Sequence, residues 1–224
     1  MTGRKFLSLI AGLLLFSGIP FVGWGLNDAG GFLSNPFRLA FVTMMAVLSV
    51  LVILFVPEEG KGQGEGIKPV KRQKISLRIL QILPLFMILS SPCCDRQKFC
   101  LFPENSVLRL IGLILVLFGF LLMNWSIIIL GKQFSIDVTV QENHRLITNG
   151  PYKYIRHPRY AGIILFLTGI PLIFLSWISL LPVLLLLLVI HWRIADEEEL
   201  MHREFKEDWE NYKKKTHSLI PFIY

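Results

Sequence analysis

The stretch Asn149–Gly162, NGPYKYIRHPRYAG, sets ionisable and ring side chains directly before a long apolar segment. Proline is favoured at the first position of a helix, so Pro158 predicts a helix start. The backbone N–H groups at such a start attract a carboxylate or a phosphate. His157 and Tyr160 flank this position, and Gly162 removes a side chain so that a neighbour can approach closely. The pattern predicts an anion-binding helix N-terminus with two ring side chains over it.

A second polar cluster, HWRIADEEELMHREFKEDWENY, spans His191–Tyr212. Arg193 and Glu197 are four residues apart and share one face of a helix, with Glu198 turned about 100° away. An exposed pair of this kind stabilises a helix by only ~0.3–0.5 kcal/mol, so stability alone explains little of it. Ionisable residues at the end of a membrane hairpin are candidates for function. We therefore expect both clusters to meet in one site.

Two simpler interpretations apply to neighbouring residues. Tyr, Arg and Lys are enriched at membrane boundaries, so Lys153 and Arg159 are interpreted as contacts to lipid headgroups. An apolar stripe at helical spacing predicts a docking face along the membrane surface or against the hairpin. That stripe consists of Met201, Phe205, Trp209 and Tyr212.

The elements that must position these residues are membrane helices. Of the 224 residues, 53% are hydrophobic and only 17% are charged, which is outside the range of soluble domains. The net charge of +7 lies in short loops between apolar segments, and no nucleic-acid-binding motif accompanies it. The composition predicts an all-α, polytopic integral membrane protein that does not bind nucleic acid.

Apolar windows predict the individual spans. Four of them cover residues 6–26, 37–56, 77–90 and 107–130. The last apolar region, 160–194, would make a helix of ~52 Å, too long for one crossing of ~30 Å. Pro171 and Pro182 interrupt it, so we expect a hairpin of two short helices. About five to six spans result, divided into an N-terminal part (1–106, three spans) and a C-terminal catalytic part (107–224) with an interfacial C-terminal helix.

Basic residues set the expected orientation. Arg4 and Lys5 precede the first span and five basic residues fill the loop 57–76, whereas the connection 27–36 carries no lysine or arginine. Both termini are therefore expected in the cytoplasm, in a cell inner membrane or the endoplasmic reticulum. The long first apolar run, with no A-x-A-like site after it, predicts a retained span rather than a cleaved signal peptide.

Two other segments carry no predicted function. EEGKGQGEG (58–66) lacks the strand and helix of a phosphate-binding loop and is interpreted as a linker. PCCDRQKFC is expected as a loop on the opposite side of the membrane, where Cys100 could pair with Cys93 or Cys94, or all three could be unrelated thiols. No metal ligands are proposed, because a metal site would need a fourth ligand and closer spacing.

The order of the two clusters resembles a known family. His144–Gly162, HRLITNGPYKYIRHPRYAG, followed by Arg193-x-x-x-Glu197-Glu198 and the later aromatic residues, resembles the isoprenylcysteine carboxyl methyltransferase family. The wider relatives of that family include membrane phospholipid methyltransferases. The resemblance covers about 90 residues and implies an integral-membrane methyltransferase that uses S-adenosylmethionine. Met201, Lys206 and Trp209 depart from the family pattern, but they lie on the docking stripe or beside it.

The resemblance also implies site residues. Arg193 would hold the methyl-accepting group and Glu197 would act beside it, as the two catalytic residues. The cofactor would be bound by His144, Arg145, Leu146, Ile147, Tyr152, His157, Pro158, Arg159, Tyr160, Glu197 and Glu198. Arg159 therefore has two interpretations, as a headgroup contact and as part of the cofactor segment.

The acceptor is left open by the sequence. A carboxylate needs only a cation such as Arg193 to orient it, whereas an amine must lose a proton to a base such as Glu197 or Glu198. This favours a lipophilic carboxylate, such as a prenylcysteine-like group, over a phospholipid amine. The expected partners are a lipophilic or lipid substrate and membrane lipids, with no obligate protein partner. A sterol-reductase-like enzyme that uses NADPH, and a scaffold without activity, are the alternatives from other classes.

Overall fold

We describe the protein from a computed structural model, which defines residues 10–55, 73–131 and 146–219. Within these ranges the regular elements are all helical, and β structure is confined to two isolated bridges. The expected all-α class is therefore confirmed. The elements are η1 (Leu14–Gly18), α2 (Ile19–Trp24), η2 (Leu26–Asp28), α3 (Ala29–Leu33), α4 (Pro36–Phe55), α5 (Gln73–Gln97), α6 (Ser106–Leu130), η4 (Gly150–Lys153), α7 (Pro158–Ile173), η5 (Ile178–Leu180), α8 (Leu181–Phe205) and α9 (Glu207–Lys213).

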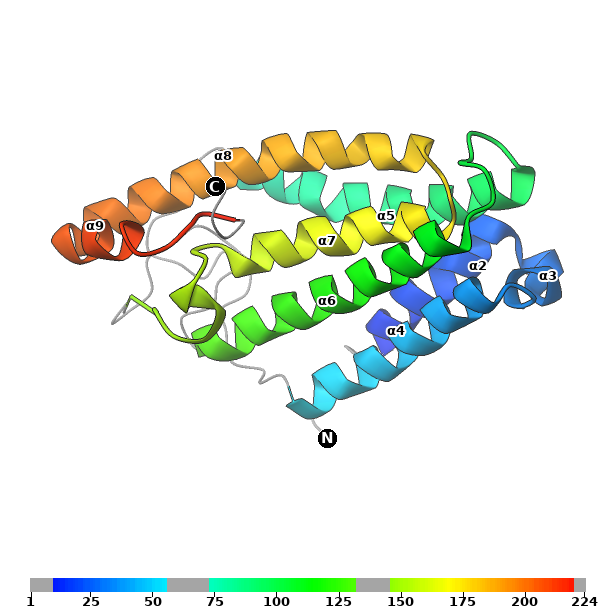
Figure 1. Cartoon of the computed structure of the whole chain (residues 1–224), viewed down its shortest axis with the longest axis horizontal. Helices are drawn as coiled ribbons and strands as arrows, with labels where there is room; N and C mark the ends of the chain where they lie inside the picture. The colour runs from blue at the N-terminus through cyan, green and yellow to red at the C-terminus, as the bar shows by residue number, and fades with distance from the viewer. Residues whose placement is uncertain (1–9, 56–72, 132–145, 220–224) are drawn as a thin grey trace.

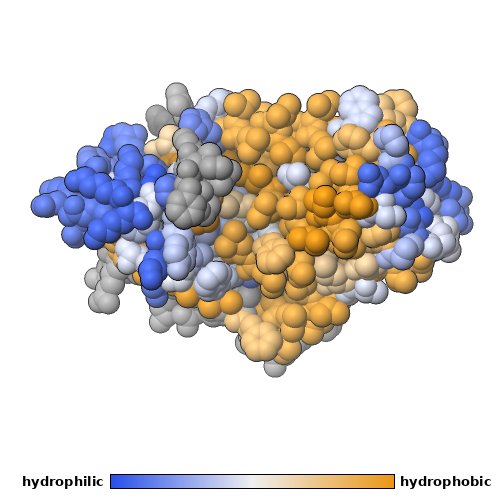
Figure 2. Space-filling view, viewed as in Figure 1, coloured by the Kyte–Doolittle hydropathy of each residue, from blue (hydrophilic) through white to orange (hydrophobic). Residues whose placement is uncertain are grey.

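The long helices lie side by side in one bundle, with α9 beyond one end and α3 at the other (Figure 1). Among the described residues, α4, α5, α6 and η5 with α8 are each long and apolar enough to cross a membrane. A fifth candidate is the pair Ile10–Trp24 and Leu26–Leu33, which is bent by 88°. Figure 2 shows a broad hydrophobic band around the middle of the bundle with hydrophilic surface at both ends. This is the surface of a multi-pass membrane protein.

Two N-terminal spans differ from the sequence expectation. The first is interrupted at Gly25, whose φ of 109° belongs to the region that favours glycine, so the helix ends there instead of continuing to residue 26. The third was expected over 77–90 but forms α5, a helix of 25 residues that retains Pro84 and Pro92. Prolines persist in membrane helices where neighbouring helices satisfy the freed backbone groups. Cys93 and Cys94 therefore lie on a helix and not in a loop.

The C-terminal hairpin is confirmed. α7 ends at Ile173 and α8 begins at Leu181, so the turn falls between the two prolines instead of at either one. Leu175 has a φ of 54°, and this turn docks on the segment after α5 through an antiparallel bridge between Leu101 and Ser176. Cys93, Cys94 and Cys100 are all free thiols.

α6 and α7 pack backbone against backbone along a glycine seam. An added Cβ at Gly119 would lie 2.5 Å from the backbone nitrogen of Phe166 and 2.6 Å from the carbonyl oxygen of Gly162. Gly112 and Gly169 form an equivalent contact seven residues further along each helix. Small residues allow membrane helices to approach this closely. The space that Gly162 provides is thus filled by α6, which is the close approach of a neighbour that the sequence predicts.

A second close contact joins α2 to α5. An added Cβ at Gly23 would lie 2.4 Å from the carbonyl oxygen of Leu89. Further along α5, the hydroxyl of Ser90 lies 3.0 Å from that of Ser179 in η5. α5 is therefore held by backbone contact on one side and by a hydroxyl pair on the other.

A buried ionic group, which we call the far cluster, lies at the end of the bundle opposite α9. Its members are Arg38, Asp95, Lys98, Glu104 and Arg109. Asp95 is fully enclosed, with its Oδ2 at 2.9 Å from Arg38 Nη1 and 3.4 Å from Arg109 Nη1. Arg109 also binds both oxygens of Glu104 and donates to the carbonyl of Ile173 at the end of α7. The far cluster joins α4, α5, α6 and α7.

Candidate functional site

The N-terminus of α7 forms as the sequence predicts. Pro158 occupies the first turn, and His157 is the N-cap residue with non-helical angles (φ −124°, ψ 57°). The His157 side chain does not cap the backbone of that turn. Its imidazole is directed to α8 instead. The free backbone N–H groups at the start of this 16-residue helix, where the positive end of the helix dipole lies, therefore receive no hydrogen bond from the N-cap side chain.

His157 lies between two carboxylates of α8. Its Nδ1 is 3.4 Å from Oε2 of Glu197, and its Nε2 is 3.3 Å from Oε1 of Glu198. Burial opposes protonation of the imidazole, but the hydrogen bonds with both glutamates and their negative charges outweigh it and raise the pKa of His157. The ring of Tyr160 stacks on the imidazole with centroids 5.9 Å apart. His157 therefore bridges α7 to α8 through both nitrogens of its ring.

Tyr160, Arg193 and Glu197 form a continuous hydrogen-bonded group. The buried Tyr160 hydroxyl donates to Glu197 Oε1 and accepts from Arg193 Nε at 2.9 Å. Arg193 Nη2 lies 3.9 Å from the same glutamate oxygen, and Nη1 donates to the hydroxyl of Ser76 on α5 at 3.3 Å. Arg193 is 3% exposed, whereas the Glu197 side chain keeps 26% of its surface exposed. We call His157, Tyr160, Arg193, Glu197 and Glu198 the site cluster.

The C-terminal segment closes one side of the site cluster. Arg156 Nε lies 2.8 Å from Oε1 of Glu198, and the Arg156 backbone N–H donates to the carbonyl of His217 at 2.8 Å. The next backbone N–H, that of His157, donates to the carbonyl of Ser218 at 3.0 Å. The segment before α7 and the segment after α9 therefore run parallel to each other here. Their backbone hydrogen bonds fix the position of His157 relative to the rest of the site cluster.

Tyr152 connects the site to α6 and α9. Its backbone carbonyl accepts from the hydroxyl of Tyr212 at 2.7 Å, and its own side chain is buried with Ser126 of α6 nearby. Burial raises the pKa of both phenols, that of Tyr212 to about 12, so both stay protonated at neutral pH. Tyr152 is therefore a buried support at the edge of the site.

Of the remaining expected site residues, two lie outside the described part of the chain and three are half-buried near the site. His144 and Arg145 lie outside the described residues. Leu146 and Ile147 are half-buried in the irregular segment before η4. Arg159 is also half-buried, and its charge is close enough to Tyr152 and Tyr160 to favour their ionised forms, which places it beside the site.

Two residues of the site were missed by sequence reasoning. Arg156 lies within Asn149–Gly162, directly before His157. That position was a signal from which its contact with Glu198 could have been predicted. Ser76 gave no such signal, because it is 117 residues away from Arg193 in the chain. Only the packing of α5 on α8 brings the two together.

The expected apolar stripe is not continuous. The helix breaks at Lys206, whose φ is 47°, so α8 ends before it and α9 begins after it. Met201 and Phe205 are half-buried at the end of α8, and Trp209 and Tyr212 are buried on α9. The break turns the second pair back toward η4, where Tyr212 meets Tyr152.

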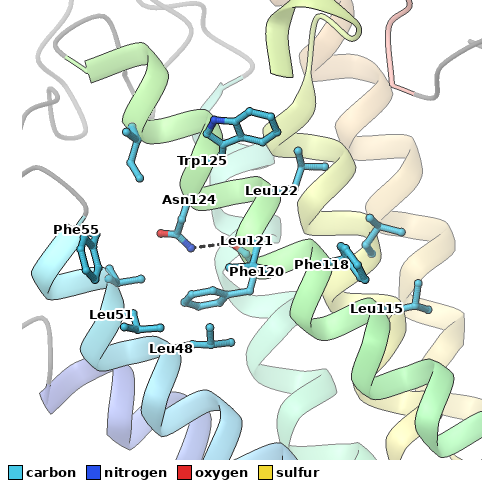
Figure 3. A pocket seen from close by; sticks show the side chains of 13 residues that line it. Leu48, Leu51, Phe55, Leu115, Phe118, Phe120, Leu121, Leu122, Asn124 and Trp125 are labelled. Atoms are coloured by element: carbon cyan, nitrogen blue, oxygen red, sulfur yellow. Dashed lines mark hydrogen bonds between the residues drawn. The ribbon is translucent and has the colours of Figure 1, made fainter. Parts of the chain in front are cut away.

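An apolar groove of about 840 Å³ lies between α4 and α6 (Figure 3). Its single polar lining side chain, Asn124, donates to the carbonyl of Phe120 and so is satisfied within α6. The groove reaches Trp125 and Ile128, on the turn of α6 that carries Ser126, which lies near Tyr152. The other lining residues are Leu48, Leu51, Val52, Phe55, Leu115, Phe118, Leu121, Leu122 and Leu165.

A multi-pass helical bundle that gathers a histidine, a tyrosine, an arginine and two glutamates in one cluster, and that carries an apolar groove between α4 and α6, has the form of an integral-membrane enzyme. Comparison with known proteins identifies the family. The profile of the isoprenylcysteine carboxyl methyltransferase family matches residues 111–203, which include α7 and most of α8.

Individual relatives agree with that match. A probable protein-S-isoprenylcysteine O-methyltransferase of Oryza sativa subsp. indica is 30% identical over 133 residues, 55% of this chain and 68% of the relative. The protein-S-isoprenylcysteine O-methyltransferase of Schizosaccharomyces pombe is 36% identical over 96 residues, 42% of this chain and 41% of the relative. The solved structure of a eukaryotic intramembrane Ras methyltransferase superposes with a TM-score of 0.58 at 19% identity, over 96% of this chain and 75% of that one.

The chain belongs to the isoprenylcysteine carboxyl methyltransferase family and is a membrane methyltransferase. This confirms the resemblance drawn from the two polar clusters. It also removes the reductase and scaffold alternatives.

Proposed function

We propose that the protein uses S-adenosylmethionine to methylate the carboxylate of a lipophilic, prenylcysteine-like acceptor. The observation that carries this proposal is the buried Arg193 guanidinium beside the partly exposed carboxylate of Glu197, next to the start of α7, which has no side-chain cap. The substrate named for the rice and fission-yeast relatives is an isoprenylated cysteine, which supports the same class of acceptor.

The residues around the start of α7 suit this cofactor. An N-terminus without a side-chain cap favours the cofactor's amino-acid carboxylate. Glu197 and Glu198, with 26% and 18% of their side chains exposed, supply negative charge for a sulfonium or an ammonium group. Leu146, Ile147 and the ring of Tyr152 provide an apolar surface for an adenine. S-adenosylmethionine supplies an electrophilic methyl group, and alignment with the acceptor is then the main task of the protein.

Arg193 distinguishes the possible acceptors. A carboxylate is ionised at neutral pH and needs only a cation to orient one oxygen toward the methyl carbon. The new O–C bond forms as the C–S bond breaks, and no proton has to move. An amine acceptor would need a base, yet Glu197 already accepts from Tyr160 and lies beside His157 and Arg193. The geometry therefore favours O-methylation over methylation of a phospholipid amine.

The hydrocarbon part of the acceptor has a suitable place in the groove between α4 and α6. Its volume is in the range of ligand sites, and its lining carries no charged side chain. The groove ends one turn of α6 from Tyr152, so a chain lying there could extend a polar head toward the site cluster. We also propose that this end of the bundle faces the cytoplasm, because the basic residues favour that side.

Labelled methyl transfer tests the proposal. The purified protein in lipid nanodiscs receives S-adenosylmethionine with a labelled methyl group and one of three acceptors: an S-farnesyl cysteine derivative, the same compound with its carboxyl amidated, or phosphatidylethanolamine. The expected product is an alkali-labile methyl ester on the first acceptor alone. Label on phosphatidylethanolamine, stable to alkali, would instead establish N-methylation and overturn the proposal.

A further inference from the structure

The hydroxyl contact between Ser76 and Arg193 joins the N-terminal half of the protein to the site cluster. Ser76 lies in the first turns of α5, is 9% exposed, and accepts a hydrogen bond from Arg193 Nη1 at 3.3 Å. It lies outside residues 111–203, which match the family profile. Its side chain brings α5 into contact with the site cluster.

Two hydrogen bonds of the Arg193 guanidinium are made to residues of different helices. The hydroxyl of Tyr160 on α7 accepts from Nε at 2.9 Å, and the hydroxyl of Ser76 on α5 accepts from Nη1 at 3.3 Å. A guanidinium is planar, so contacts at two of its nitrogens determine the orientation of the whole group. Arg193 itself stands on α8, and its plane is therefore set by helices on both sides of it.

α5 can hold Ser76 in place because the helix is fixed elsewhere. Ser90 contacts Ser179 in η5, at the start of the α8 segment, and Leu89 packs its backbone against Gly23. From Ser76 to Ser90 is 14 residues, or about 21 Å along a helix. α5 and α8 are thus joined by a hydroxyl contact near each end, and the contact at the site end is the one that includes Arg193.

We propose that Ser76 is a positioning residue for acceptor binding: its hydroxyl orients the Arg193 guanidinium that receives the acceptor carboxylate. This inference rests on the proposed function, since it needs an oxyanion acceptor at Arg193. The N-terminal half of the chain then contributes a hydrogen-bonding side chain to the site, in addition to helices that pack in the bundle. The role acts through Arg193, so cofactor binding does not depend on it.

Kinetics on three serine variants of the full-length protein in nanodiscs test the proposal. Ser76→Ala is expected to raise the KM for the S-farnesyl cysteine acceptor roughly fivefold to tenfold, with kcat little changed and with unchanged affinity for S-adenosylmethionine by calorimetry. Ser76→Thr, which keeps a hydroxyl, is expected to restore most of the affinity for the acceptor.

Ser91→Ala is the matched control. Ser91 is a fully buried serine of the same helix, and its hydroxyl donates to the carbonyl of Met87 within α5. Its removal is expected to leave the KM for the acceptor unchanged, while any loss in Tm shows what a buried serine of α5 contributes to stability alone.

The outcomes separate the two proposals. A wild-type protein that transfers no methyl group to the carboxylate overturns the proposed function, and this inference with it. An active wild-type protein with an unchanged KM in Ser76→Ala overturns this inference alone. A Ser76→Ala variant that loses cofactor affinity, or that Ser76→Thr fails to restore, shows a structural role and also overturns it.

Discussion

At the far cluster, Asp95 is completely enclosed between Arg38 and Arg109, whereas Glu197 and Glu198 at the site keep 26% and 18% of their side chains exposed. Both groups hold together helices that are distant in the chain. The far cluster satisfies its charges internally and leaves its central carboxylate inaccessible. The site cluster leaves carboxylate surface open beside a buried arginine. The two ends differ in their central carboxylates, which are inaccessible at Asp95 and partly accessible at Glu197 and Glu198, whereas the exposed carboxylate of the far cluster, Glu104, contacts only Arg109 among the cluster members.

The largest effect on stability is expected at the far cluster. Asp95→Asn keeps the shape of the side chain but leaves Arg38 and Arg109 buried without their shared carboxylate, and removing one partner of a buried pair costs about 3–5 kcal/mol. Unfolding of the detergent-solubilised protein, followed by tryptophan fluorescence, measures the loss. Glu104→Gln is the control, since Glu104 is 64% exposed and its change should be much smaller. Equal losses in both variants would contradict the described difference in burial.

The glycine seam joins the two ends through α6 and α7. Gly119→Ala would place a Cβ 2.5 Å from the backbone nitrogen of Phe166, and backbone cannot yield as a side chain does. We expect a loss of about 2–3 kcal/mol in the same unfolding measurement. Gly30→Ala is the control, because an added Cβ there meets no atom within 4 Å. A neutral Gly119→Ala variant would show that the seam is looser than described.

At the site cluster, substitution should reduce activity and spare stability. Arg193→Lys keeps the charge but loses the planar fork that binds Tyr160 and Ser76, and we expect kcat/KM to fall about 100-fold, close to 2.7 kcal/mol. Arg203→Lys is matched to it, on the same helix and paired with Glu199 four residues away, but exposed. It should retain full activity. A Tm loss in Arg193→Lys as large as that of Asp95→Asn would remove the contrast between the two clusters.

The smallest effect is a dependence of stability on pH. The two glutamates raise the pKa of His157 above its ordinary value of 6.5, so its interaction stabilises the fold fully below pH 6.5 and is lost as the pH rises through the raised value. The Tm advantage of wild type over His157→Gln should therefore shrink with rising pH, by about 2–4 °C in total. His202→Gln, at an exposed histidine paired with Glu210, is the comparison variant. An advantage that grew with pH would reverse the predicted sign.

Local signals predicted the site end better than the far end. The helix start at Pro158 and the shared face of Arg193 and Glu197 are properties of a few consecutive residues, and both are found in the structure. Arg38 and Arg109 lie inside apolar runs, and nothing in their neighbours indicates that Asp95 pairs with both. Such contacts arise only when separate helices pack.

The boundaries of the helices show the same limit. α4 and α6 follow their apolar windows to within one residue of each expected end. α5 extends seven residues beyond its window because Pro84 and Pro92 are accommodated by neighbouring helices, a compensation that the sequence of α5 itself does not contain. The roles expected for the individual cofactor-binding residues stay predictions.

Where backbones touch, helices cannot slide without a steric clash, and this applies to α6 with α7 and to α2 with α5. The two helices of each pair are therefore locked against sliding past one another. α4 and α8 meet these pairs through side chains, which change rotamer on the picosecond to nanosecond scale when they are exposed. The groove between α4 and α6 is lined by apolar side chains, whereas the start of α7 is held against α6 by backbone contact at Gly162 and Gly119.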